Sequence, residues 1–220
     1  MERNRATTYF AHELPIIHLF LFVKLYFERM TMTKIAIILT QGFADWEYTL
    51  LAGTGGPYYG LDIQFFSTEA GEVHSMGGLV AIVSQKLNDI YNWSPEVIVV
   101  VGGTCWVSEQ APDISELLKS HHTNGGIVAG ICGGTLALAR AGLLNEIQHT
   151  SNDADFLNQN ADGYSGAEHF CKSASAIKDN RVITAPGTAP VSFTAAIFEN
   201  SGLGEDTALQ FRKMMAAEHI

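Results

Sequence analysis

Short apolar runs alternate with segments of helical character along most of this chain. Residues 35–39 and 97–101 form apolar runs without in-out alternation, as expected of strands buried on both faces, and residues 61–67 alternate as a further strand. Between them lie segments with helical character, of which 46–51 and 114–120 are the clearest. Strands that alternate with helices in this way indicate an α/β fold with a mostly parallel sheet and helices on both faces.

Glycine and proline mark the expected boundaries of several elements. We expect residues 53–60 to close the first helix, residues 71–78 to form a loop, and residues 79–87 to form a further strand and turn. In the last third of the chain the pattern predicts a helix, a β-hairpin and two more helices, at residues 153–160, 172–184, 191–198 and 205–217.

Residues 1–31 do not fit this pattern. The run from Ile16 to Val23 is apolar apart from His18, but it is too short to span a bilayer and lacks a small-residue cleavage site. We expect residues 1–31 to be an extension that is disordered or results from a start codon assigned too early, with Met32 as the natural start. The domain then covers residues 32–220, and an amphipathic interfacial helix is the alternative for the extension.

The most informative stretch is Gly125 to Thr135, followed by helix-forming residues. An apolar strand, a Gly-x-Cys-x-Gly turn and a helix form the layout of a nucleophile elbow. Glycines are needed in such a turn because side chains there would clash. The sulfur of Cys132 would lie at the start of the helix, where N–H groups favour a thiolate. The competing interpretation is a buried structural cysteine.

Composition narrows the possible partners and the cellular location. The chain has 220 residues, of which 47% are hydrophobic and 16% charged, with a net charge of −10. This charge disfavours nucleic acid and anionic membranes, so a small-molecule substrate is expected. Three widely spaced cysteines fit neither a disulfide framework nor a zinc site, which favours a reducing cytoplasm. The eight histidines include no His-x-x-x-His pair, so we expect no metal, and we expect no cofactor either.

Functional residues are expected where the strands end. The turns after Leu39, Val101 and Ile131 should converge at the carboxyl edge of the sheet. They bring Glu47, the pair Gly102-Gly103 and Cys132 together. A buried carboxylic acid beside a thiol can exchange a proton with it, whereas backbone amides in a Gly-Gly turn can bind an oxyanion. From spacing alone, Glu47 is better explained as a first-turn carboxylate that complements the helix dipole.

These motifs together resemble the ThiJ/PfpI superfamily, a branch of the class I glutamine amidotransferase-like proteins. The resemblance begins near Lys34 and rests on the segments 34–39, 42–47, 99–103 and 129–134. It implies a flavodoxin-like three-layer sandwich and a homodimer. It also implies that Glu47 is the acid partner of a catalytic Cys132, and that the amides of Gly103 and Gly133 form the oxyanion site.

The resemblance extends to one further residue, and it has limits. His149 falls where many superfamily members place a histidine near the cysteine, so a catalytic role is expected. Gly102, and Trp106 three residues after the Gly-Gly pair, are expected to line the pocket. Protease-like members carry a histidine directly after the cysteine, where this chain has Gly133. Amidotransferases carry a His-x-Glu near the C-terminus, and residues 185–190 contain no histidine.

The sequence therefore predicts a cysteine-dependent enzyme acting on a small carbonyl or amide compound. Its most concrete form is a cofactor-independent glyoxalase or deglycase-like activity, carried by Cys132, Glu47 and His149 with the amides of Gly103 and Gly133. The alternatives are hydrolysis of a small amide, as in an amidase or protease, and a non-catalytic role as a redox-stress sensor or chaperone with an oxidisable Cys132.

Overall fold

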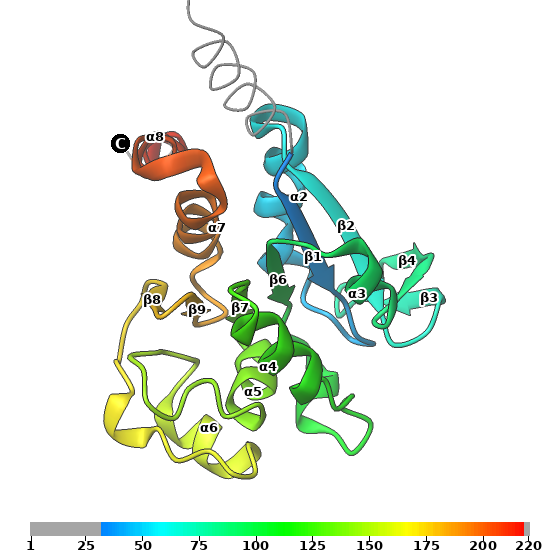
Figure 1. The fold of residues 1–220 in the computed structure, drawn as a ribbon, viewed down its shortest axis with the longest axis vertical. Coiled ribbons are helices and arrows are strands. Elements are labelled where there is room, and N and C mark those ends of the chain that lie inside the picture. The colour runs from blue at the N-terminus through cyan, green and yellow to red at the C-terminus, as the bar shows by residue number, and fades with distance from the viewer. Residues whose placement is uncertain (1–31, 218–220) are drawn as a thin grey trace, which may run out of the picture. The chain divides into compact units, whose positions relative to one another are not determined.

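A seven-stranded sheet forms the centre of residues 32–217, the part of the chain that this computed structural model describes (Figure 1). Its order is β5-β2-β1-β6-β7-β9-β8, and all neighbouring strands are parallel except β8, which runs antiparallel to β9. The strands are β1 (Lys34–Ile38), β2 (Asp62–Ser67), β5 (Gln85–Lys86), β6 (Val97–Val100), β7 (Ile127–Ile131), β8 (Ile177–Asp179) and β9 (Val182–Ala185). The predicted α/β fold with a mostly parallel sheet is confirmed. The extension expected at residues 1–31 lies outside the described residues.

Helices cover both faces of the sheet. One face packs against α2 (Asp45–Tyr59), α7 (Pro190–Phe198) and α8 (Gly204–Ala216), and the other against α3 (Asp89–Trp93), α4 (Ser115–Thr123), α5 (Gly134–Arg140) and α6 (Ala154–Asn160). Along β1, Ile35 and Ile37 pack in the core beside α2, α7 and α8, whereas Ala36 and Ile38 pack in the core on the other face of the sheet. Because both faces are buried, the central strands are apolar throughout.

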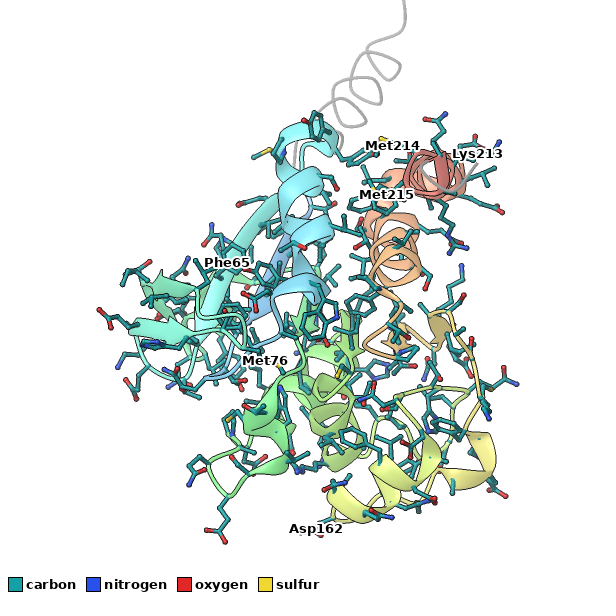
Figure 2. The ribbon with its side chains drawn as sticks, turned by 180° about the vertical axis from the view of Figure 1, so that it is seen from behind. Phe65, Met76, Asp162, Lys213, Met214 and Met215 are labelled. Atoms are coloured by element: carbon teal, nitrogen blue, oxygen red, sulfur yellow. The ribbon has the colours of Figure 1, made fainter. Side chains whose placement is uncertain are left out.

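Three short helical turns connect the longer elements: η1 (Thr104–Val107), η2 (Ala167–His169) and the π-helical turn η3 (Glu199–Leu203). The last helix, α8, is amphipathic. Met214 is 53% exposed, whereas Met215 packs against the core next to α7 (Figure 2). Within residues 32–217, no helix is both long and apolar enough to cross a membrane.

Two predicted boundaries in the first half of the domain are wrong. Helix α2 continues through the glycine-rich stretch to Tyr59 and ends at Gly60, which has a φ of 68°. Close packing explains these small residues, because a Cβ on Gly55 would lie 2.7 Å from Ile63 Cδ1. The expected loop at 71–78 contains a strand, β3 (Gly71–His74), which pairs with β4 (Val80–Val83) in a separate hairpin.

The predicted hairpin in the second half forms, but it is shorter than expected. Residues 172–176 are not in a strand, and β8 begins only at Ile177. The turn to β9 places Asn180 and Arg181 at φ values of 44° and 60°. Two successive residues with positive φ are typical of the tight turns that join antiparallel strands.

Candidate active site

Cys132 occupies a sharp turn between β7 and α5. Its φ is +55°, which costs a non-glycine residue about 1–2 kcal/mol. The turn is held by a hydrogen bond from Cys132 N to Ala185 O at 2.9 Å and one from Thr135 Oγ1 to Cys132 O at 2.6 Å. A Cβ on Gly134 would lie 2.2 Å from Val100 O, so only glycine fits there. The predicted nucleophile elbow is confirmed, glycines included.

Glu47 lies beside this cysteine although 85 residues separate them in sequence. It stands in the first turn of α2, is fully buried, and its Oε2 accepts a hydrogen bond of 2.7 Å from Gly102 N. A Cβ on Gly187 would lie 3.0 Å from Cys132 Sγ and 3.1 Å from Glu47 Oε1. Gly187 therefore packs directly against both the sulfur and the carboxyl oxygen, and a side chain at this position would crowd both.

The surroundings shift the ionisation of both groups. Burial raises the pKa of Glu47 to about 7, against opposing hydrogen bonds from Cys132 and Gly102. Burial also raises the pKa of Cys132 to about 11, and the charge of Glu47 adds to this, while hydrogen bonds from Asn152 and the Gly133 N–H lower it. The expected depressed pKa of the thiol is thus wrong. Desolvation and a neighbouring carboxylate outweigh the amides of the turn, and a thiolate is favoured only when Glu47 holds the proton.

Asn152 is a site residue that the sequence analysis missed. Its Nδ2 donates to Cys132 Sγ at 3.3 Å, and its Oδ1 accepts a hydrogen bond of 3.0 Å from Gly187 N. Because the Gly187 N–H is a donor, the orientation of the amide is fixed with its NH₂ group toward the sulfur. Trp46 Nε1 donates to Gly187 O at 2.8 Å, so Gly187 is held from both sides.

The two expected oxyanion donors lie next to each other. A Cβ on Gly133 would be 3.3 Å from Gly103 N. Gly103 has a φ of 156°, and a Cβ there would lie 2.4 Å from Gly42 O, so the position requires glycine. Among the hydrogen bonds of residues 32–217, none uses the Gly103 N–H. This donor is available to a ligand beside the sulfur.

His149 has other partners than Cys132. Its ring is fully buried, with Nδ1 at 2.8 Å from Ile147 O and Nε2 at 2.7 Å from Tyr164 Oη. Burial lowers the pKa of His149, which favours the neutral ring. The residue three positions later, Asn152, contacts the sulfur instead.

Trp106 and Gly102 pack against the residues of the site. Trp106 is fully buried, and its Nε1 donates to Val101 O at 2.8 Å. Its Cδ1 would lie 3.3 Å from a Cβ on Gly133, so the indole packs under the elbow. A Cβ on Gly102 would lie 2.5 Å from Glu47 Oε2, which explains why a glycine follows β6.

Comparison with known proteins places this site in a family. The model of the DJ-1/PfpI family matches residues 33–200, a span that contains the elbow, Glu47 and Asn152. The chain belongs to the DJ-1/PfpI family. The resemblance inferred from the motifs is thereby confirmed, and with it the flavodoxin-like fold.

Three proteins that resemble this chain are a DJ-1 superfamily protein of known structure, an uncharacterized protease and a glyoxalase. The DJ-1 superfamily protein Atu0886 from Agrobacterium tumefaciens has a similar structure, with a TM-score of 0.81 and 35% identity over 86% of this chain and 100% of that chain. The uncharacterized protease YoaZ of Bacillus subtilis is 29% identical over 177 residues, 77% of this chain and 84% of that protein. The glutathione-independent glyoxalase DJR-1.2 of Caenorhabditis elegans is 28% identical over 88 residues, 40% of this chain and 47% of that protein.

Proposed function

We propose that this protein is a cysteine-dependent enzyme that acts on small carbonyl compounds, as a cofactor-independent glyoxalase. The observation that carries the proposal is the placement of Cys132 Sγ beside the buried carboxyl of Glu47, next to the amides of Gly103 and Gly133. The glyoxalase name of one relative agrees with it.

The proposed reaction begins with proton transfer from the thiol of Cys132 to Glu47. The pKa of Glu47, raised to about 7, suits a group that takes and returns a proton near neutral pH. The thiolate then adds to the aldehyde carbon of a dicarbonyl, a C–S bond forms, and the resulting oxyanion accepts hydrogen bonds from the N–H groups of Gly103 and Gly133.

The remaining steps redistribute hydrogen within the bound compound. Glu47 first gives the thiol proton to the oxyanion, which yields a hemithioacetal, and then removes the proton from the former aldehyde carbon. Glu47 passes this proton to the ketone oxygen to form an enediol, and the proton of the other hydroxyl moves to the neighbouring carbon, which gives a 2-hydroxy thioester. Water cleaves the thioester, and the products are a hydroxy acid and the free thiol of Cys132. The sum is one dicarbonyl and one water giving one hydroxy acid, with no net oxidation.

Methylglyoxal consumption with lactate detection tests this proposal. We expect turnover in the wild type and loss of turnover in Cys132→Ser and Glu47→Gln, while His121→Gln, which alters a histidine outside the site, keeps the wild-type rate. Turnover that persists in Cys132→Ser contradicts the proposal. A wild type without turnover but with a peroxide-sensitive Cys132 favours a redox sensor.

Amide hydrolysis is the second candidate, favoured by the protease name of the Bacillus subtilis relative. The same thiolate attacks an amide carbonyl, and the C–N bond breaks as protonated Glu47 gives its proton to the leaving amine. Water then hydrolyses the thioester, which gives a carboxylic acid and the free thiol of Cys132. Release of ammonia or amine from small amides, absent in Cys132→Ser, distinguishes this activity from the first.

A further inference from the structure

A groove of about 380 Å³ lies beside the candidate active site. Its lining comes from the start of α6, from residues 170, 172 and 173, and from Ser151 and Asn152 just before α6. Asn152 is also the residue whose Nδ2 donates to Cys132 Sγ at 3.3 Å. The side chain of Asn152 therefore lies between the groove and the reacting sulfur.

The size of the groove indicates a ligand larger than a three-carbon dicarbonyl. Its volume falls at the lower end of the range, about 300–1,000 Å³, that is typical of small-molecule binding pockets. The reacting carbonyl itself would lie at Cys132 Sγ, the atom to which Asn152 Nδ2 donates. The groove is left for the part of the substrate that does not react.

An aromatic ring and a cation give the groove its chemistry. The half-buried ring of Phe170 lines it and packs edge-to-face on His149, with ring centres 5.8 Å apart, which holds the ring in place. Lys172 also lines the groove, and it takes part in none of the ion pairs found within residues 32–217.

Two carboxylates, those of Asp153 and Asp155, also line the groove, and they differ in their existing hydrogen bonds. Asp153 Oδ1 accepts a hydrogen bond of 2.7 Å from Phe156 N and caps α6. Asp155 lines the groove from the first turn of that helix. A ligand in the groove thus meets the ammonium group of Lys172 and the carboxylate of Asp155, which can accept a hydrogen bond from an N–H group.

We propose that this groove binds the non-reacting part of the substrate, and that this part carries an apolar or aromatic body and a carboxylate. The body packs on Phe170, the carboxylate faces Lys172, and an amide N–H of the substrate faces Asp155. The substrate class is then an acyl or carbonyl compound of roughly N-acyl amino acid size. The inference rests on the proposed function only in taking Cys132 as the attacking group.

Alkylation of Cys132 tests the groove without requiring turnover. The probes are N-(bromoacetyl)phenylalanine and its carboxamide, which differ only in the carboxylate. In each case the thiolate forms a C–S bond, the C–Br bond breaks, and bromide leaves. Peptide mass analysis gives the rate at each cysteine, and Cys105, outside the groove, supplies the baseline ratio in the same molecule.

We expect Cys132 to favour the acid over the carboxamide about two- to fivefold relative to Cys105, the range of one partly exposed charge pair. Lys172→Gln removes this preference. Lys119→Gln, an equal charge change on α4, keeps it. Phe170→Leu slows both probes relative to bromoacetamide.

Equal rates for the two probes in the wild type, or a preference that survives Lys172→Gln, would overturn the groove assignment. The proposed function is tested separately, by the turnover of methylglyoxal. A retained preference without methylglyoxal turnover keeps the groove and rejects the glyoxalase. A Cys132 that bromoacetamide cannot alkylate overturns both proposals.

Discussion

The side-chain amide of Asn152 donates a hydrogen bond to the sulfur of Cys132 at 3.3 Å. The same amide accepts from Gly187 N, so it cannot turn its oxygen toward the sulfur without losing that bond. A side-chain amide does not ionise near neutral pH, so it cannot act as an acid or a base there. Asn152 therefore stabilises a thiolate by hydrogen bonding, and proton transfer is left to Glu47.

Asn152→Ala should raise the pKa of Cys132 further, because the thiolate loses a donor. We expect iodoacetamide to alkylate Cys132 about three- to tenfold more slowly at pH 8, the effect of one hydrogen bond to a partly exposed charged group. Asn158→Ala, at an exposed position of α6, is the matched control. An unchanged alkylation rate in Asn152→Ala would show that the bond does not matter for the thiolate.

Glu47→Gln should lower the pKa of Cys132 from its value of about 11, because both the charge of Glu47 and its hydrogen bond raise it. Ultraviolet absorbance of the thiolate against pH measures this in a chain where Cys105 and Cys171 are replaced by serine. Glu116→Gln, an exposed carboxylate on α4, should leave the titration unchanged. A pKa that rises in Glu47→Gln would mean that protonated Glu47 is the main donor to the thiolate.

The raised pKa of Glu47 also predicts how stability changes with pH. The folded state favours the protonated carboxyl, so the stabilisation is complete below pH 4.5 and is lost as pH rises through about 7. The shift from 4.5 to about 7 corresponds to about 3 kcal/mol. Urea unfolding of wild type and Glu47→Gln from pH 4 to 8 measures it. We expect the stability difference between the two proteins to change by this amount over that range, and a constant difference would contradict the raised pKa.

Two glycine substitutions should have opposite effects. Gly102→Ala places a Cβ 2.5 Å from Glu47 Oε2 and 2.7 Å from Cys132 Cβ, so we expect a loss of about 1–3 kcal/mol and of activity. Gly53→Ala meets nothing within 4 Å in the middle of α2 and should stabilise by about 0.5–1 kcal/mol. Thermal unfolding and the methylglyoxal assay measure both. A Gly102→Ala protein of wild-type stability would mean that Glu47 can move aside freely.

The sequence alone determined the architecture and the centre of the site. Apolar strands alternating with helices specify a sheet buried on both faces, and the glycines around Cys132 specify a sharp turn, because both depend on neighbours in the chain. The carboxyl ends of parallel strands meet at one edge, which is why Glu47, Gly103 and Cys132 were predicted to converge.

Only the tertiary structure decided which residues complete the site and how the groups ionise. Asn152 and Gly187 contact the sulfur through loops whose paths depend on distant packing, and nothing in their local sequence distinguishes them from His149. The sequence predicted a low pKa for Cys132 from the helix that follows it. Burial and the proximity of Glu47 reverse that direction, because desolvation depends on everything packed around a group and not on its neighbours in the chain.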